Sequence, residues 1–264
     1  MIRIVTLLGM DFADLGAAEA AAAIAERPAG APFGYVVTPN ADHLVRMSRD
    51  PGLAGIYRNA WLRLLDSRVV AAMARGCGML TPRVATGSDL TALLLARHIL
   101  AGEQITIIGL RPLWLPALVA RFGLAPPFHY DPPMGFDNDP AAFRDTVAFI
   151  VAHPARLVFL AVGSPRQEHL AAAVAASGQA TGTGLCIGAS LLFLAGAERR
   201  APGWMQRDGL EWAYRLAKDP RRLASRYLLD SPRIVPLLLR ERAAARHVAA
   251  VTAPFAPMPD AQEP

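Results

Sequence analysis

The segment YVVTPNADHLV, residues 35–45, passes from an apolar run through a turn at Pro39 into a helix-like pattern. Four side chains with hydrogen-bonding groups follow the apolar run directly: Thr38, Asn40, Asp42 and His43. A turn at the protein surface needs fewer polar groups than this. We therefore interpret the segment as a buried strand whose carboxyl end contributes to a binding site.

Strand-like runs alternate with helix-like runs as far as residue 197. Strands are predicted near residues 2–8, 34–38, 62–66, 104–109, 157–162 and 183–188. Helices are predicted near residues 15–26, 41–59, 67–75, 88–101, 112–122, 140–152, 166–176 and 189–196. This alternation predicts a Rossmann-like α/β fold, in which helices flank a parallel sheet.

Polar or glycine-rich stretches fall at the carboxyl ends of five predicted strands. They are TPNADH (38–43), Asp66, Gly109, GSPRQE (163–168) and the glycines around Gly188. Ligands of open parallel sheets bind at this edge. The five stretches therefore predict one crevice, with Gly109 and Gly163 among its candidate substrate-binding residues.

After about residue 198 the pattern changes to helices alone, at 203–217, 220–229 and 231–248. Asp219-Pro220 and Ser231-Pro232 each place a capping side chain before a proline, which is typical of a helix start. The last residues are rich in proline, and we expect them to be disordered. We therefore divide the chain into an α/β core (1–198), a helical basic appendage (199–250) and a tail (251–264).

The positive charge of the chain is concentrated in this appendage. Residues 199–246 contain twelve lysines and arginines against five acidic residues, whereas the whole chain has a net charge of +5. Such a region suits anionic lipid, a diphosphate or nucleic acid. Trp204, Trp212 and Tyr214 lie among the arginines and favour a membrane interface, although a solvated basic helix face remains an alternative.

The composition is that of a globular protein, with 264 residues of which 53% are hydrophobic and 19% charged. Cys77 and Cys186 are too few for a disulfide framework and suit a reducing compartment. Acidic residues follow the N-terminal apolar run, so we expect a strand there and no signal peptide. The uncharged stretch 179–197 is rich in glycine and suits a strand, turn and helix better than a membrane span.

Asp66 ends the apolar run LRLLD and is the candidate catalytic carboxylate. A carboxylate beside a dry crevice can take a proton from an attacking hydroxyl group. A helix cap for the segment that begins at Ser67 is an equal alternative, because aspartate is a favoured capping residue.

Two further groups of polar residues are candidate binding sites. Thr38 and Asn40 can bind ring amides, hydroxyls or a phosphate, and turn chemistry around Pro39 is their alternative role. The segment VGSPRQEHL (162–170) reads as a strand, a turn and a helix start that contains Arg166 and Gln167. Backbone amides at a helix start favour an anion such as phosphate, and an ordinary capped loop is the alternative.

Several motifs are absent or explained more simply. Asp137-Asn138-Asp139 has the D-x-D form of a metal site, but the following Pro140 suggests that Asp139 caps a helix. We therefore predict no metal site. The chain has no G-x-G-x-x-G after its first strand and no G-x-x-x-x-G-K-[ST], so dinucleotide and P-loop sites lack their glycines.

The motifs occur in an order that resembles the WecG/TagA/CpsF glycosyltransferases, family 26 of the sugar transferases. The resemblance runs from about Tyr35 to Ile234. Its short motifs are TPNADH (38–43), Asp66, TGSDL (86–90), PPMGF (132–136), VGSPRQE (162–168) and FLAG (193–196). The long stretch RAPGWMQRDGLEWAYRL (200–216), continued by PRRLASRYL (220–228), is the most specific.

This resemblance implies a bacterial enzyme of the Rossmann-like type called GT-E. Such enzymes move a sugar from a UDP-sugar donor to a polyprenyl-diphosphate-linked acceptor at the cytoplasmic face of the membrane. The implied chemistry inverts the anomeric centre without a metal or another cofactor. We accordingly expect a cytoplasmic protein that is peripheral on the inner membrane face, through residues 199–246, and has no nucleic-acid partner.

Residue roles follow from the matched motifs. Asp66 is implied as the base that deprotonates the acceptor hydroxyl, and Thr38, Asn40 and Gln167 would line the nucleotide-sugar pocket. Arg215 and Arg222 of the appendage would fold over the site and neutralise the departing diphosphate, which is electrostatic stabilisation of the transition state.

The chain departs from the family pattern at two positions. The family has an acidic residue where this chain has Leu192, which leaves the donor sugar open, and it often has glycine where this chain has Ser67. N-acetylmannosamine, its uronic acid, glucose and glucuronate are the donors considered, for an exopolysaccharide or a related envelope polymer. The acceptor is open, and so is a homo-oligomer.

Two alternative functions belong to other classes. A basic lipid- or nucleic-acid-binding module would bind in a salt-sensitive manner without sugar transfer, and it leaves the polar strand ends without a purpose. A nucleotide-dependent oxidoreductase is disfavoured by the missing glycine fingerprint.

Overall fold

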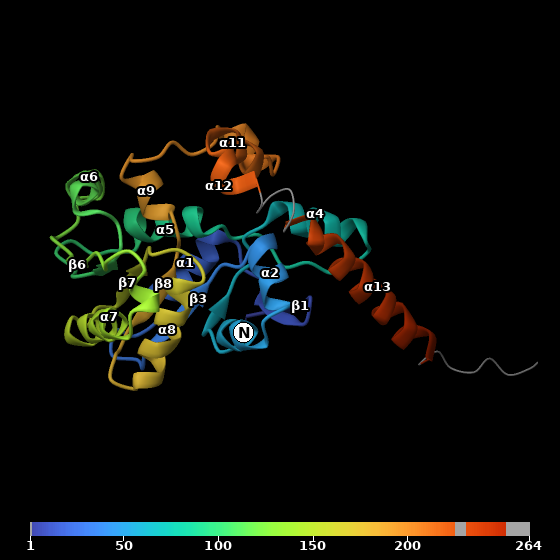
Figure 1. Cartoon of the computed structure of the whole chain (residues 1–264), viewed down its shortest axis with the longest axis horizontal. Helices are drawn as coiled ribbons and strands as arrows, with labels where there is room; N and C mark the ends of the chain where they lie inside the picture. The colour runs from blue at the N-terminus through green and yellow to red at the C-terminus, as the bar shows by residue number, and fades with distance from the viewer. Residues whose placement is uncertain (1, 225–230, 252–264) are drawn as a thin grey trace, which may run out of the picture.

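The computed structural model describes residues 2–224 and 231–251 (Figure 1). Inside that range, the side chains of residues 206, 207, 215, 222, 223 and 245–251 are outside the description. The centre of the molecule is a six-stranded parallel sheet in the order β4-β3-β8-β7-β5-β6. The strands are β3 (Gly34–Val37), β4 (Leu62–Arg63), β5 (Thr106–Ile108), β6 (Phe128–Tyr130), β7 (Leu157–Leu160) and β8 (Thr183–Cys186). The prediction of a Rossmann-like α/β fold is confirmed.

Helices cover both faces of this sheet (Figure 1). One face packs against α1 (Ala17–Ala25), α5 (Gly87–Arg97), α6 (Leu115–Phe122) and α9 (Ser190–Leu194). The other packs against α2 (Ala41–Met47), α3 (Pro51–Arg58), α7 (Pro140–Ala152) and α8 (Arg166–Ser177). Alternate strand residues supply the two cores, so Val36 faces the first group and Tyr35 and Val37 face the second.

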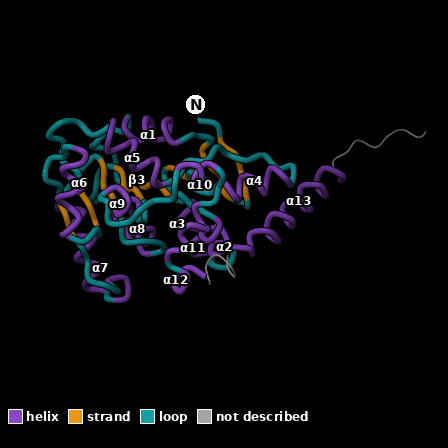
Figure 2. The backbone as a smooth tube through the Cα atoms, turned by 90° about the horizontal axis from the view of Figure 1, so that it is seen from above, coloured by secondary structure: helices purple, strands orange, loops and turns teal. Residues whose placement is uncertain are grey.

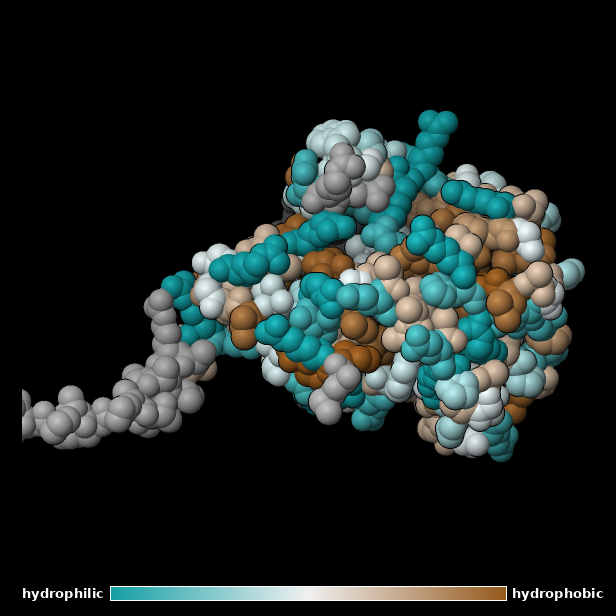
Figure 3. All heavy atoms as spheres, turned by 180° about the vertical axis from the view of Figure 1, so that it is seen from behind, coloured by the Kyte–Doolittle hydropathy of each residue, from teal (hydrophilic) through white to brown (hydrophobic). Residues whose placement is uncertain are grey.

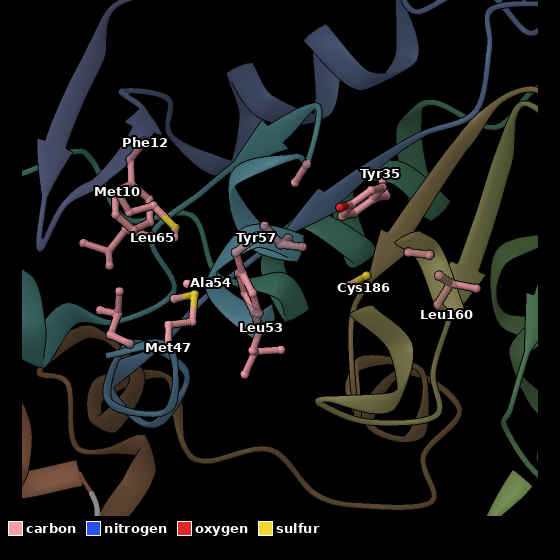
Figure 4. Close-up of a cluster of buried hydrophobic side chains, with 14 of the residues drawn as sticks. Met10, Phe12, Tyr35, Met47, Leu53, Ala54, Tyr57, Leu65, Leu160 and Cys186 are labelled. Carbon is pink, nitrogen blue, oxygen red and sulfur yellow. The ribbon is translucent and has the colours of Figure 1, made fainter. Parts of the chain in front are cut away.

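The N-terminal segment forms a strand, as predicted, but its predicted place in the parallel sheet is wrong. β1 (Ile4–Leu7) and β2 (Met10–Ala13) form a separate antiparallel pair. The turn between them has positive φ at both Leu8 (54°) and Gly9 (67°), which suits a two-residue hairpin. The hairpin is anchored because Leu7, Met10 and Phe12 are buried in the core. Figure 4 shows Met10 and Phe12 gathered beside Leu65 in this cluster.

Other elements also differ from the prediction, and the helix expected at 203–217 is divided into α10 (Gly203–Arg207) and α11 (Glu211–Lys218). The helix expected at 41–59 is divided into α2 and α3, because Asp50 caps a new helix at Pro51 and its Oδ1 accepts the backbone N–H of Leu53 at 3.0 Å. The edge strand β6 had no predicted counterpart. It has three residues, all only partly buried, so it lacks the continuous apolar run of a central strand.

The remaining elements complete the described part of the chain. They are α4 (Arg68–Gly76), the 3-10 turns η1 (Pro112–Trp114), η2 (Phe136–Asn138) and η4 (Ser231–Arg233), α10 (Gly203–Arg207), α11 (Glu211–Lys218), α12 (Pro220–Ala224) and α13 (Ile234–Val251). The helix start at Pro220 is confirmed. Residues 225–229 of the predicted second appendage helix (220–229), and the tail beyond residue 251, lie outside the described residues.

The last helix, α13, leaves the body of the molecule beside α4 (Figures 1 and 2). Its first turns nevertheless belong to the core, because Ile234 (2% exposed) and Leu238 (1% exposed) are buried in the same cluster as α2. Glu241 also accepts the backbone N–H of Leu8 at 2.7 Å. In the part of the chain that is described, no helix is both long and apolar enough to cross a membrane.

Candidate functional site

Asp66 lies at the carboxyl end of β4, on the edge where ligands of parallel sheets bind. The backbone stays aligned with β3 beyond the strand itself, because Leu64 N–H donates to Val37 O and Asp66 N–H donates to Pro39 O, both at 3.0 Å. The side chain of Asp66 is half-buried. Ser67 caps α4 by accepting the backbone N–H of Val70 at 3.1 Å, so the cap alternative for Asp66 at that helix is wrong.

The N-terminus of α5 is brought to this carboxylate by the neighbouring chain segment. Val84 pairs with Leu65 beside β4, and three residues later α5 begins at Gly87. The backbone N–H of Gly87 donates to Oδ2 of Asp66 at 3.0 Å. A helix N-terminus carries partial positive charge, which makes this a favourable position for a carboxylate.

Polar side chains from three strand ends converge at Gly87. A methyl group on its Cα would lie 3.0 Å from Thr38 Oγ1, 3.6 Å from Asp66 Oδ2 and 3.8 Å from Ser190 Oγ. Thr38 follows β3, Asp66 follows β4 and Ser190 begins α9 after β8. The structure thus brings Thr38 and Asp66 together, and glycine at position 87 permits their close approach.

Sequence reasoning missed Ser88 and Ser190 in this cluster. Their hydroxyl oxygens lie 3.4 Å apart, and Ser190 also donates to Ile187 O at 2.6 Å. Ser88 could have been found from the sequence, because it lies in the matched motif TGSDL (86–90). Ser190 stands in an uncharged, glycine-rich stretch, where nothing in the pattern distinguishes it.

Asn40 is the N-cap of α2. Its Oδ1 accepts the backbone N–H groups of Asp42 at 3.1 Å and His43 at 3.4 Å, so this oxygen caps the helix that follows the turn at Pro39. Asp42 is buried and pairs with Arg46 at 2.7 Å. The role of Asn40 in sugar binding remains a prediction.

Gln167 lies in the first turn of α8 and is only 3% exposed. Its Oε1 accepts the backbone N–H of Gly188 at 2.8 Å, and its Nε2 donates to Oε1 of Glu168 at 2.9 Å. The amide oxygen therefore holds the loop after β8 against α8, whereas the amide nitrogen binds the neighbouring carboxylate of α8 itself. Its predicted contact with the nucleotide sugar is untested.

Glu168 is the most buried carboxylate of this network, at 1% exposure. Its Oε1 also accepts the hydroxyl of Tyr57 at 3.0 Å. Burial raises the pKa of the Glu168 carboxyl, even though hydrogen bonds from Gln167 and Tyr57 act in the opposite direction. This group gives α3, α8 and β8 a shared polar contact behind the strand ends.

Gly109, Gly163 and Arg166 lie at the ends of β5 and β7, which β3 and β8 separate from β4. Gly109 has φ of 85°, and a methyl group there would lie 3.0 Å from the carbonyl of Ala161, so close packing of the two strand ends requires glycine. Gly163 has φ of 81° and Arg166 begins α8 beside it. They form a second part of the strand-end surface, apart from the cluster at Gly87.

The two appendage arginines and the D-x-D segment complete the predicted residues. Arg215 lies in α11 and Arg222 in α12, but their side chains are outside the description. Asp139 caps α7, as predicted, by accepting the backbone N–H groups of Ala141 at 2.9 Å and Ala142 at 3.3 Å. Among the described residues, no three histidine, cysteine, aspartate or glutamate side chains gather as metal ligands.

The residues that replace family residues have local roles. Ser67 caps α4, and Leu192 is a partly buried residue of α9 that packs against the apolar core beside α5. An apolar residue at position 192 therefore suits its surroundings in this chain.

A helix-covered parallel sheet with a carboxylate at its polar strand-end edge defines this chain as a Rossmann-like α/β protein with a candidate active site. Comparison with protein families gives a match to the glycosyl transferase WecG/TagA/CpsF family over residues 5–248. The chain belongs to this family, and the resemblance drawn from the motifs is confirmed. It is accordingly a glycosyltransferase of cell-envelope polysaccharide biosynthesis.

Proposed function

We propose that this glycosyltransferase moves a sugar from a UDP-sugar to a polyprenyl-diphosphate-linked acceptor, in the synthesis of an exopolysaccharide or a related envelope polymer. The observation that carries the proposal is the position of Asp66. Its carboxylate lies at the ligand-binding edge of the sheet, 3.0 Å from the first amide of α5 and close to Thr38. This is a suitable place for a general base beside a bound sugar.

In the proposed reaction Asp66 takes the proton of the acceptor hydroxyl while that oxygen attacks the anomeric carbon. The bond between the anomeric carbon and the UDP oxygen breaks, its electron pair leaves with UDP, and the configuration inverts. Arg215 and Arg222 neutralise the charge on the departing diphosphate, which is stabilisation of charge that develops in the transition state.

The donor would lie across the strand ends. Thr38 and Asn40 would contact the sugar near Asp66, and Gln167 would contact it from the buried side. The start of α8, with Gly163 and Arg166, would receive the diphosphate, because backbone amides at a helix N-terminus favour an anion. Gly109 would leave room for the nucleotide beside β5.

The appendage would hold the enzyme at the inner face of the cytoplasmic membrane. It carries an excess of seven positive charges over residues 199–246. It also exposes Trp204 (53%), Trp212 (38%) and Leu239 (50%). On the face seen from behind, hydrophobic and hydrophilic residues are interspersed (Figure 3). Basic and aromatic residues together suit an anionic lipid surface.

The membrane contact is tested with vesicles. We expect the full chain to bind vesicles of anionic lipid more tightly than vesicles of neutral lipid, and to lose most of that binding as salt is raised. Equal binding to both kinds of vesicle would contradict the electrostatic part of the proposal.

The activity is tested by incubating the full chain with UDP-sugars that carry N-acetylmannosamine, its uronic acid, glucose or glucuronate. A donor that binds the folded state raises the midpoint of thermal unfolding. That donor should then release UDP only when a lipid-diphosphate-linked sugar is added. Protection by no UDP-sugar, or release of UDP that ignores the acceptor, would contradict the proposed donor and acceptor classes.

A further inference from the structure

Arg200 joins two helices through one guanidinium group. It lies between α9 and α10, and its side chain is 21% exposed. Its Nη1 lies 2.6 Å from Oδ1 of Asp89, in the first turn of α5. Its Nη2 lies 3.4 Å from Oε2 of Glu211, the first residue of α11. The same Nη2 also donates to Oγ1 of Thr86, the N-cap of α5, at 3.4 Å.

These contacts converge on the helix end that binds the candidate base. Thr86 caps α5 by accepting the backbone N–H of Asp89 at 3.1 Å, and Gly87 between them donates its N–H to Asp66. One helical turn therefore contacts Arg200 through Thr86 and Asp89, and Asp66 through Gly87. A shift of this turn moves the donor that orients the carboxylate.

The ion pairs are partly shielded from solvent. Asp89 is 35% exposed and Glu211 is 24% exposed. Two carboxylates on one planar guanidinium also need the fork geometry of arginine, which a lysine ammonium cannot reproduce. We therefore expect this group to contribute more than an isolated surface pair, which contributes little.

The ion pair with Glu211 ties the start of α11 to Arg200. The turn before α11 also lies close to α4, because a methyl group at Gly209 would lie 3.6 Å from Arg68 Cβ and 3.7 Å from Val69 Cγ2. Glu211 and Arg215 are four residues apart, which is about one helical turn. An anchor at Glu211 thus determines where the backbone of Arg215 lies relative to α5.

From these contacts we propose that Arg200 is a positioning residue, which holds the first turn of α11 against the N-terminus of α5 and so places the appendage relative to Asp66. The catalytic consequence rests on the proposed function, whereas the structural consequence does not. If Arg200 only forms a surface ion pair, its replacement should have no effect on α11.

The structural consequence is tested by hydrogen exchange of the full chain, measured over residues 203–218. We expect Arg200→Gln to speed exchange in α11 by about tenfold or more, because the helix opens locally once its anchor is lost. Arg200→Lys should lie between the wild type and Arg200→Gln. The matched control is Arg97→Gln, an exposed arginine in the last turn of α5, which should leave α11 unchanged.

A double-substitution cycle separates this contact from a general loss of stability. Glu211→Gln alone should speed exchange in the same segment, and Arg200→Gln with Glu211→Gln should add little to either single change, since both remove one interaction. Exchange in β7 and β8 reports whether each variant keeps its core. Wild-type exchange in α11 of Arg200→Gln, or fully additive effects in the double variant, would overturn the proposal.

The catalytic consequence is tested by kinetics on the same variants. We expect kcat of Arg200→Gln to fall about ten- to a hundredfold, with KM for the donor changed less than about threefold and with partial rescue in Arg200→Lys. If Arg200→Gln kept the wild-type kcat although hydrogen exchange in α11 became faster, the proposed link between Arg200 and Asp66 would be wrong. If the wild type transfers no sugar, the proposed function fails, and the exchange experiment still decides whether Arg200 positions α11.

Discussion

The backbone N–H of Gly87 lies 3.0 Å from Oδ2 of Asp66 and donates a hydrogen bond to it. The two residues are 21 positions apart, and the contact joins the end of β4 to the start of α5. The carboxylate is thus oriented by the backbone of a helix end. Residues that move this helix end, or that crowd Gly87, should affect the candidate base without touching it.

Gly87→Ala tests this crowding. Its methyl group would lie 3.0 Å from Thr38 Oγ1, so Thr38 must move by a few tenths of an ångström beside Asp66. We expect sugar transfer to fall by about tenfold or more and the free energy of unfolding to fall by about 1 kcal/mol. Kinetics and urea unfolding measure the two effects.

Gly55→Ala is the matched control for that change. Gly55 lies inside α3, and a methyl group there would meet no atom within 4 Å. This substitution should raise the free energy of unfolding by about 0.5–1 kcal/mol, because alanine favours a helix, and should leave transfer unchanged. If both variants lost sugar transfer equally, crowding at Gly87 would not be the cause, and the prediction would be wrong.

Glu168→Gln tests the buried carboxyl group through pH. Because burial raises the pKa of Glu168 above its ordinary value of 4.5, the folded protein holds this proton to a higher pH than the unfolded chain does. The stabilisation from the protonated group is complete below about pH 4.5 and is lost as pH rises through the folded pKa. As pH rises, the free energy of unfolding of the wild type should therefore decline relative to that of Glu168→Gln, by at most about 1.4 kcal/mol per pH unit.

Urea unfolding of both proteins between about pH 4 and pH 8 measures this difference. Parallel stability–pH profiles of the two proteins would mean that the folded and unfolded states bind the Glu168 proton equally, which would contradict the raised pKa. A difference that grows in favour of the wild type as pH rises would mean that the pKa is lowered.

Arg156→Met tests the link between the helices at the opposite edge of the sheet. Its Nε and Nη2 bind Glu103 at 2.7 and 2.8 Å, and Nη1 donates to Ala25 O at 3.0 Å. Both ion-pair partners are mostly buried, so their separation should lower the free energy of unfolding by about 3 kcal/mol. Arg3→Met removes a long contact of 3.9 Å to Asp14 from an arginine side chain that is 68% exposed, and should change the free energy of unfolding by less than about 0.5 kcal/mol. Similar losses in the free energy of unfolding of the two variants would contradict the claim that burial makes the Arg156 ion pair more important.

Two neighbouring leucines test whether α13 belongs to the core. Leu238 is 1% exposed and Leu239 is 50% exposed. Leu238→Ala should lower the free energy of unfolding by about 2–5 kcal/mol, whereas Leu239→Ala should change it by less than about 1 kcal/mol. Urea unfolding distinguishes them. If Leu238→Ala were as mild as Leu239→Ala, α13 would behave as part of a separable appendage.

The same residues bear on how the appendage should be studied. A chain cut after residue 198 would lose Ile234 and Leu238, so it would expose the part of α2 and α4 that they cover. We expect such a core to aggregate more than the full chain. The division at residue 198 remains a prediction, and single substitutions test it better than a truncation.

Sequence patterns were sufficient for the parallel sheet because strand–helix alternation reflects local preferences. They failed at the N-terminus, where the hairpin depends on the turn at Leu8 and Gly9 and on contacts with distant residues such as Leu65. They also missed β6, whose short, half-exposed sequence carries little apolar signal.

The candidate site also has features that could be predicted from the sequence and features that could not. Thr38 and Asp66 could be proposed from their places after apolar runs, and the structure brings them together. The contact between Asp66 and Gly87 could not be predicted, because it depends on how the segment after α4 returns along β4. Nor could the contact of Glu168 with Tyr57 or that of Arg200 with Asp89, because each joins residues 111 positions apart.

Sugar transfer by Asp66→Asn is the most direct test of the central claim, that this carboxylate is the base. The variant should retain thermal protection by the UDP-sugar donor and lose turnover by about a hundred- to ten-thousandfold. Asp137→Asn, at an exposed acid of the D-x-D segment, should keep wild-type turnover. Near-normal release of UDP by Asp66→Asn, in the presence of the lipid-linked acceptor, would contradict the account.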